Sequence, residues 1–190
     1  MAVALDISIV ICAYTEKRWE ETVAAVESIK NQSTPATQII VVIDHNRALL
    51  LRAIRNISGV VIVENRKQRG LSGARNTGVE MAIGEIVGFI DDDASAAEDW
   101  LERIGAGYAD QSVIGVGGAV EPIWHNARPK WFPEEFDWVV GCSYRGMPSS
   151  AATIRNPLGC NMTFRRSVFE LVGGFREDIG RVGTLPVGCE

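Results

Sequence analysis

The sequence is poor in the residues that most often bind transition metals or act as nucleophiles. It has two histidines, His45 and His125, and neither has the partner spacing of a zinc site. Its four cysteines include no C-x-x-C pair, and Cys12 lies in an apolar run. This pattern predicts buried free thiols rather than disulfides or a redox centre. The sequence also lacks a local signature of Ser-His-Asp or Cys-His catalysis.

Long hydrophobic runs and an excess of positive charge are missing as well. The longest apolar runs, such as 39–43, have the length of a strand and are too short to span a membrane. The first residues lack the pattern of a signal peptide. We therefore expect a cytoplasmic protein, with peripheral contact to the inner face of the membrane as an open alternative. The formal net charge of -5 argues against a general nucleic-acid binder.

Hydrophobic residues make up 46% of the 190 residues, which is enough to build the core of one α/β domain. The first half alternates short apolar strands with helical patterns. This alternation is typical of a mostly parallel central sheet with helices on both faces. The predicted strands are 7–12, 38–43, 60–63 and 86–90, and the predicted helices are 19–29, 48–57, 71–81 and 97–108.

The second half, after Glu121, lacks the regular alternation of strand and helix patterns. A glycine-rich strand, 113–120, leads into a segment in which tryptophans and phenylalanines alternate with prolines and charges. We predict long structured loops there, and the aromatic residues are open to two interpretations, a sugar-binding platform or a small satellite core. The remaining expected elements are a strand at 161–164, a helix at 167–172 and a loop-like tail at 180–190.

Polar residues follow every predicted strand of the first half. In open parallel sheets, ligands bind outside the carboxyl ends of the strands, so these residues are expected to share one rim. They are Tyr14 and Glu16, Asp44 and Asn46, Glu64 and Asn65, and Asp91 to Asp93.

Three adjacent carboxylates, Asp91, Asp92 and Asp93, come directly after an apolar strand. Adjacent carboxylates repel one another, and a hard cation such as Mg2+ or Mn2+ relieves that repulsion together with substrate phosphates. The alternative is a solvated acidic turn that caps the helix starting near Ala97. The position at the carboxyl end of a strand favours the metal site.

A glycine-rich stretch, 69–78, opens the helix that follows the third strand. Its glycines allow the backbone to approach a ligand, and a helix N-terminus favours anions. Arg69 and Arg75 can neutralise phosphate charge, although a tight turn with surface arginines is the alternative. The stretch is neither G-x-G-x-x-G nor a Walker A loop, so dinucleotide or ATP-type binding is not indicated.

Asp44 and Tyr14 are each open to two interpretations. The Asp44 carboxylate can accept a hydrogen bond from a base N–H, since an ionised carboxylate is an acceptor only. Tyr14 can stack on a base or line its pocket. The alternatives are a turn residue for Asp44 and a half-buried core aromatic for Tyr14.

These segments together resemble the family 2 glycosyltransferases of the GT-A fold. The resemblance covers nearly the whole chain and depends on the order and spacing of five stretches. They are 9–16 (IVICAYTE), 70–78 (GLSGARNTG), 89–93 (FIDDD), 159–166 (GCNMTFRR) and 173–175 (GGF).

The resemblance implies roles for individual residues. Asp93 would be the main metal ligand and Asp91 would lie closer to the ribose, as the outer positions of a D-x-D motif. Gly159 and Asn161 would line the sugar or acceptor side. The residues implied to bind the nucleotide sugar are Ala13, Tyr14, Glu16, Asp44, Arg75, Asp91 and Asp92.

The resemblance further implies one domain over 1–190, with a nucleotide-sugar-binding half, 1–120, and an acceptor-side half, 121–190. The family often has an acidic pair late in the domain, and this chain reaches only its first acid, Glu190, the predicted catalytic base. We therefore expect a truncated second half that binds donor better than it transfers sugar, because chain ends tend to be mobile. The Asp44-His45-Asn46 segment also departs from the family's small-residue turn.

The predicted function is inverting transfer of a sugar from a nucleotide-diphosphate donor, UDP-linked, to a saccharide, lipid or other hydroxyl acceptor. Mg2+ or Mn2+ would stabilise the leaving diphosphate. The alternative is a non-catalytic nucleotide-sugar-binding or regulatory module, whereas intact Asp91 and Asp93 favour the enzyme. A nucleotidyltransferase would need a glycine-rich, lysine-bearing loop after the first strand, and residues 13–16 do not supply one.

Overall fold

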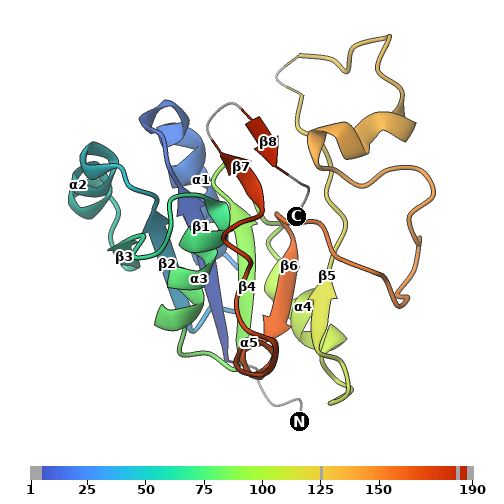
Figure 1. Ribbon diagram of the computed structural model, residues 1–190. Coiled ribbons are helices and arrows are strands. Elements are labelled where there is room, and N and C mark those ends of the chain that lie inside the picture. Colours follow the sequence, from blue (N-terminus) through green and yellow to red (C-terminus); the bar gives the residue numbers. More distant parts are fainter. Residues whose placement is uncertain (1–5, 125, 183–184, 188–190) are drawn as a thin grey trace.

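Four adjacent parallel strands form one side of a six-stranded sheet in the computed structural model, which describes residues 6–124, 126–182 and 185–187. The parallel strands are β1 (Ile7–Ala13), β2 (Gln38–Ile43), β3 (Val61–Glu64) and β4 (Ile86–Asp91). β6 (Met162–Arg165) runs antiparallel to β4, and β5 (Gly115–Gly117) runs antiparallel to β6. The strand order is therefore β3-β2-β1-β4-β6-β5 (Figure 1), which confirms the predicted mostly parallel sheet.

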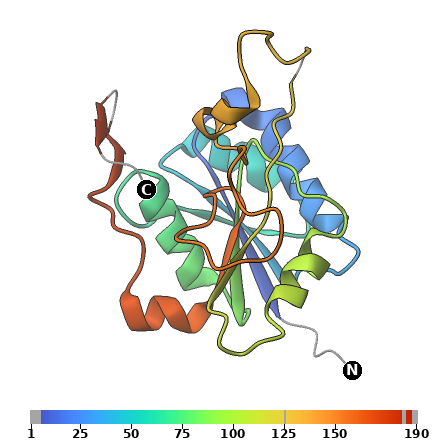
Figure 2. The same ribbon diagram turned by 90° about the vertical axis from the view of Figure 1, so that its right-hand side faces the viewer.

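Helices cover both faces of this sheet, as the alternating sequence pattern predicts (Figure 2). Successive residues of β1 point to opposite faces, so Ile9 and Ile11 belong to one apolar core and Val10 to the other. The first core includes α1 (Trp19–Lys30), α2 (Arg47–Asn56) and α4 (Trp100–Gly107), and the second includes α3 (Leu71–Met81) and α5 (Arg166–Val172).

Two glycines let α3 lie close to its neighbours. A Cβ added at Gly78 would lie 2.3 Å from Val10 Cγ1 on β1, and one at Gly73 would lie 1.9 Å from the carbonyl oxygen of Gln68. Val10 is buried in the central strand and has no room to move away. The glycines therefore set how closely α3, and the side chains it carries, approach the sheet.

The second half is less regular, as predicted, but its elements differ in extent. β5 is shorter than the predicted strand because its pairing with β6 ends at Gly117, opposite Met162. α4 begins at Trp100 rather than at Ala97. Among the loops lie two 3-10 helices, η1 (Glu16–Arg18) in the first half and η2 (Glu134–Val140) in the second.

One expectation about the tail is wrong. Residues 180–190 were expected to be loop-like, yet β7 (Gly180–Val182) and β8 (Leu185–Val187) pair in an antiparallel hairpin. Strands of three residues are too short to show the alternation on which strand prediction depends. Figures 1 and 2 place this hairpin beside the upper end of α3.

Candidate active site

The polar residues that follow the parallel strands do share one rim of the sheet. In the strand register, Ala13 of β1 lies opposite Ile43 of β2, and Ile43 lies opposite Glu64 of β3. Cys12 of β1 lies opposite Asp91 of β4. The carboxyl ends of all four strands are therefore level, and the predicted clustering of the polar residues is confirmed.

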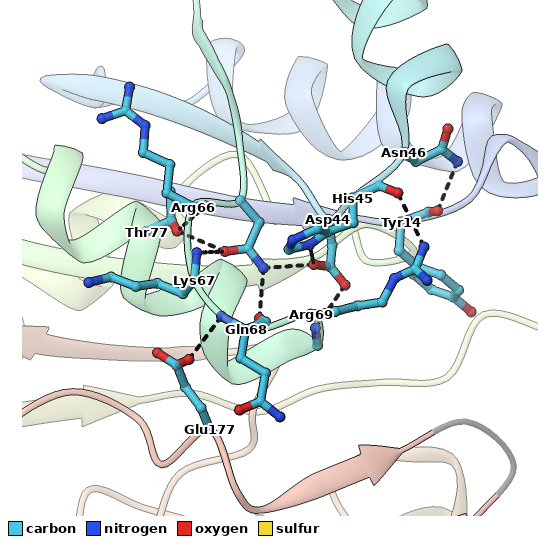
Figure 3. A network of polar contacts seen from close by, with 12 residues as sticks. Tyr14, Asp44, His45, Asn46, Arg66, Lys67, Gln68, Arg69, Thr77 and Glu177 are labelled. Atoms are coloured by element: carbon cyan, nitrogen blue, oxygen red, sulfur yellow. Dashed lines mark hydrogen bonds and ion pairs between the residues drawn. The ribbon is translucent and has the colours of Figure 1, made fainter.

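Asp44, just past β2, is the centre of a buried polar network (Figure 3). Its Oδ1 accepts a hydrogen bond from Asn65 Nδ2 at 2.7 Å and lies 2.9 Å from His45 Nδ1, and its Oδ2 accepts one from the backbone N–H of Gly70 at 3.0 Å. Asn65 Oδ1 in turn accepts a hydrogen bond from Thr77 Oγ1 on α3 at 2.9 Å. Asp44 thus joins β2 to the glycine-rich stretch.

The turn after Asp44 links the β1 and β2 ends of the rim. His45 has a left-handed backbone, with φ of 50°, and its carbonyl accepts a hydrogen bond from Arg69 Nη2 at 3.2 Å. Asn46 caps α2 through its Oδ1 and donates from Nδ2 to the carbonyl oxygen of Tyr14 at 3.0 Å and to Glu16 Oε2 at 3.3 Å. These contacts fix the segment after β1.

Tyr14 and Ala13, both predicted to hold the nucleoside, differ in accessibility. The Tyr14 side chain is exposed, whereas Ala13 is buried at the end of β1. Tyr14 therefore offers its ring to a ligand, and Ala13 can offer only its backbone. The guanidinium of Arg18 lies 5.8 Å from the centre of the Tyr14 ring.

The three aspartates at the end of β4 do not point the same way. Asp91 and Asp93 expose 38% and 44% of their side chains, whereas Asp92 is buried. Arg18 Nη1 lies 3.1 Å from Asp92 Oδ1 and 3.0 Å from Asp93 Oδ2, so it bridges two of the carboxylates. Arg18 was not among the predicted site residues, because a basic residue soon after β1 was its only signal in the sequence.

Asp92 is the buried acid of this cluster. Burial raises its pKa to about 6, and Arg18 opposes that rise. Its Oδ2 is buried and receives no hydrogen bond from the described part of the chain. Asp92 therefore supports the turn from beneath, while Asp91 and Asp93 face outward.

The outward pair suits a hard divalent cation that binds together with a diphosphate. Among the residues that the structure describes, no three His, Cys, Asp or Glu side chains converge on one point, so the described protein groups alone offer too few ligands. Mg2+ and Mn2+ are commonly bound by one or two carboxylates plus substrate phosphates and water. Two exposed carboxylates fit that donor set.

Arg75 places a positive charge beside these carboxylates. It projects from α3, is buried, and its Nη2 lies 3.6 Å from Asp91 Oδ1. The same Nη2 donates to the carbonyl oxygen of Gly159 at 3.1 Å. Arg75 thus connects the end of β4 with the loop before β6, where the sugar or acceptor side was expected.

The side chain of Asn161 makes its hydrogen bonds inside the protein. Its Oδ1 accepts a hydrogen bond from Trp100 Nε1 at 2.9 Å, and its Nδ2 donates to the carbonyl oxygen of Ala119 at 2.9 Å. This buried amide ties β6 to α4 and to the segment after β5, and its contact with a sugar stays a prediction. Glu190, the predicted base, lies outside the described residues.

Two hollows lie near these groups. One of about 370 Å³ is lined by Ser72, Arg75, Gly159 and Phe175 among others, and so it adjoins the Arg75 site. The other, of about 540 Å³, lies within the loops of the second half between residues 119 and 145.

The tryptophan-rich segment contains a small satellite core, which is one of the two interpretations that the sequence left open, and the sugar-binding platform stays a prediction. Trp124 and Trp131 each contact Phe132 edge to face, with ring centres 5.6 and 5.8 Å apart, as in a small satellite core. Trp131 and Trp138 nevertheless remain exposed, at 80% and 57%. Among the described residues, no helix combines the length and the apolar character needed to cross a membrane.

Comparison with known proteins identifies related sequences. The family model described as glycosyl transferase family 2 matches residues 8–173. The glucosyl-dolichyl phosphate glucuronosyltransferase of Haloferax volcanii is 37% identical over 183 residues, covering 94% of this chain and 58% of that protein. Glycosyltransferase AglE of the same organism is 26% identical over 175 residues, covering 89% of this chain and 55% of that protein.

Solved structures share the fold. The mannosyltransferase PcManGT from Pyrobaculum calidifontis, in complex with GDP-Man and Mn2+, superposes with a TM-score of 0.68 at 27% identity, covering 94% of this chain and 51% of that one. TarS 1-349 of S. aureus in complex with UDP-GlcNAc has a TM-score of 0.61 at 16% identity, covering 87% and 47%. The fold is thus of the GT-A type, and the chain spans about half the length of these relatives, from 47% of TarS 1-349 to 58% of the Haloferax glucuronosyltransferase.

Proposed function

The chain belongs to glycosyl transferase family 2, and on that premise we propose that it transfers a sugar from a nucleoside-diphosphate donor to an acceptor hydroxyl. The transfer would invert the anomeric centre and depend on a divalent cation. The observation that carries the proposal is the rim itself, where two outward carboxylates, Asp91 and Asp93, lie beside the buried cation Arg75.

Each part of this arrangement answers a need of the reaction. Negative charge develops on the diphosphate as the bond to the sugar breaks. A positive side chain stabilises that charge best when it is already oriented toward it and does not have to move during the reaction. Arg75 is held in place by Asp91 and by the Gly159 carbonyl, so its charge is already oriented. Through the contact of Arg75 with Gly159, the leaving group would lie next to the loop that we assign to the acceptor side.

A divalent cation would be held by Asp93 and Asp91, with Asp92 remaining in its buried contact with Arg18. When bound, Mg2+ or Mn2+ neutralises phosphate charge and makes the diphosphate a better leaving group. The presence of Mn2+ in the complex of PcManGT, which is 27% identical, supports this part of the proposal.

Inversion follows if the acceptor hydroxyl attacks in a single displacement while a carboxylate removes its proton. We assign that base to Glu190, on the resemblance to the family. The competing assignment is a non-catalytic module that binds the nucleotide sugar without transfer. Release of nucleoside diphosphate from the donor in the presence of acceptor separates the two, because a binding module would leave the donor intact.

We propose uridine as the base of the donor. Asp44 stands at the expected position, and a carboxylate can accept the uracil N–H. Three groups already contact this carboxylate, so one acceptor position at most remains for the base. Guanosine is the rival, since PcManGT holds GDP-Man. Competition between UDP and GDP for the Mn2+-loaded protein decides: tighter or equal binding of GDP overturns the uridine assignment.

The acceptor and the location are proposed from the relatives and from the surface. The Haloferax relative is named for a lipid-phosphate acceptor, glucosyl-dolichyl phosphate. The exposed Trp131 and Trp138 suit the interface between water and lipid, where tryptophan is enriched. We therefore propose a cytoplasmic protein that acts at the inner membrane face on a lipid-linked or free saccharide hydroxyl.

Calorimetry with nucleoside diphosphates and their sugars, with and without Mn2+, tests the core of the proposal. We expect binding that requires Mn2+ and that is lost in Asp93→Ala. A wild-type protein that binds no nucleoside diphosphate at millimolar Mn2+ would overturn it.

A further inference from the structure

Arg75 is held by a segment that lies about a hundred residues later in the chain. Its guanidinium carbon lies 5.4 Å from the centre of the Phe175 ring and 6.0 Å from that of Phe89. The two rings meet edge to face at 5.2 Å, and Phe169 packs against both. A cation over aromatic faces is stabilised by the ring quadrupoles, most strongly when water is excluded. Phe175 therefore forms one wall of the site in which the guanidinium lies.

Asn76, the next residue on α3, fixes the backbone of Phe175 in both directions. Its Nδ2 donates to the carbonyl oxygen of Phe175 at 2.8 Å, and its Oδ1 accepts from the N–H of Phe175 at 2.7 Å. A Cβ at Gly174 would lie 2.4 Å from Asn76 Oδ1, so the chain passes too close for a side chain there. The paired hydrogen bonds determine where the Phe175 ring stands.

Glu177 adds a second attachment from the same segment. Its Oε1 accepts a hydrogen bond from Asn76 Nδ2 at 3.0 Å, and its Oε2 accepts one from the backbone N–H of Gln68 at 2.9 Å, which Figure 3 shows. These donors, first the Asn76 amide and then the Gln68 N–H, lower the pKa of Glu177. The carboxylate therefore ties the segment to the loop that leads into α3.

We propose that Asn76 and Glu177 are positioning residues for the donor diphosphate. They hold Phe175 against Arg75, and Arg75 then presents its charge beside Asp91. We call Asn76, Phe175 and Glu177 the clamp. The inference depends on the proposed function, because the diphosphate is the ligand that Arg75 would meet.

Two variants and one matched control test the clamp. Asn76→Ala removes both hydrogen bonds to Phe175, and Glu177→Gln keeps the shape of the side chain but turns one acceptor into a donor. Glu27→Gln makes the same charge change on α1, which packs on the opposite face of the sheet, at an exposed residue that forms an ion pair with Lys30. Far-UV circular dichroism and thermal melts establish that each variant is folded.

The first readout compares UDP with UMP in the presence of Mn2+. When the clamp is broken, Arg75 should lose its hydrogen bond to the diphosphate. Losing a hydrogen bond to a charged group weakens binding by roughly ten- to a hundredfold. Both clamp variants should therefore raise the Kd for UDP by about tenfold or more while leaving the Kd for UMP within about twofold. Glu27→Gln should change neither. Equal losses for the two nucleotides, or no loss for UDP, would overturn the proposal, since general damage to the fold does not distinguish them.

The second readout does not require any nucleotide. The Nε–H resonance of Arg75, assigned from its disappearance in Arg75→Lys, should be sharp and protected in the wild-type protein. It should broaden or shift in both clamp variants and stay unchanged in Glu27→Gln. An unchanged resonance in folded Asn76→Ala would mean that Phe175 does not hold Arg75. If the wild-type protein binds neither nucleotide, the proposed function fails while this measurement still decides whether the clamp exists.

Discussion

Gly78 in α3 and Gly105 in α4 are helical glycines with opposite surroundings, and the same substitution should move stability in opposite directions. A Cβ at Gly78 would meet three side-chain carbons of Val10 at 2.3, 2.8 and 3.2 Å, whereas a Cβ at Gly105 would meet no atom within 4 Å. Gly105→Ala should therefore show only the gain in helix propensity. Gly78→Ala should show that gain opposed by overlap with the central strand.

The expected changes in the free energy of unfolding follow from these contacts. Replacing glycine by alanine inside a helix stabilises by about 0.5–1 kcal/mol. Overpacking a tight interior costs about 1–3 kcal/mol, and Val10 has little freedom to adjust because it is buried in β1. We expect Gly105→Ala to be stabilised by about 0.5–1 kcal/mol and Gly78→Ala to be destabilised by about 1–2 kcal/mol. At about 2–4 °C per kcal/mol, their melting temperatures should differ by roughly 3–12 °C.

Urea unfolding is the suitable assay, because a shift of the midpoint at constant slope reports a change in stability alone. Val10→Ala provides an internal check. Combined with Gly78→Ala, it should cost less than the sum of the two single changes, because the smaller side chain makes room for the new methyl group. Equal stabilisation by both glycine substitutions would refute the argument that close approach to β1 requires Gly78.

Three further outcomes are expected. Asp93→Ala should abolish Mn2+-dependent binding of nucleoside diphosphate in calorimetry, and unchanged affinity in the folded variant would count against the metal site. The metal-free melting temperature should stay almost unchanged, because the repulsion between neighbouring aspartates is relieved while the half-exposed ion pair with Arg18 is lost. Burial raises the pKa of Cys12 to about 12, so the thiol stays neutral at pH 8, and iodoacetamide should modify it only after unfolding in urea, as mass spectrometry can verify. Asn161→Ala should lower the free energy of unfolding by about 2 kcal/mol, because Trp100 Nε1 loses a buried hydrogen bond and the carbonyl of Ala119 loses a partly buried one. A stability equal to that of the wild type would contradict the interior role of this amide.

The parallel half of the fold was predictable because its signals are local. Each of the four strands is a short run of apolar residues bounded by polar ones, and the rule that parallel strands end at one edge then places Asp44 and Asp91 together. The hairpin of β7 and β8 was missed because each strand has only three residues. Length, rather than composition, limited the prediction there.

The supporting contacts of the site were less predictable than its polar residues. Arg18 reaches Asp92 across 74 positions of sequence, and Phe175 reaches Asn76 across 99. Neither contact leaves a periodic or spacing signal in the sequence. The structural role of Asp44 was not predictable for the same reason. Its hydrogen bonds to Asn65 and Gly70 hold two segments together, in addition to its proposed contact with the nucleotide base.

In one turn of α3, each of the four residues 75–78 contacts a different part of the structure. Arg75 faces Asp91, Asn76 faces Phe175, Thr77 faces Asn65, and Gly78 faces Val10. Three consecutive side chains and the Cα of Gly78 thus meet four different neighbours, and the helix has no freedom to rotate or slide without losing a contact or creating a clash. During divergence, a change of sugar or acceptor is then easier to achieve in the loops of the second half than here. We expect relatives with different specificities to keep this turn and to vary the segment from Glu121 to Asn156, so that evolution of the protein takes place around a fixed helix.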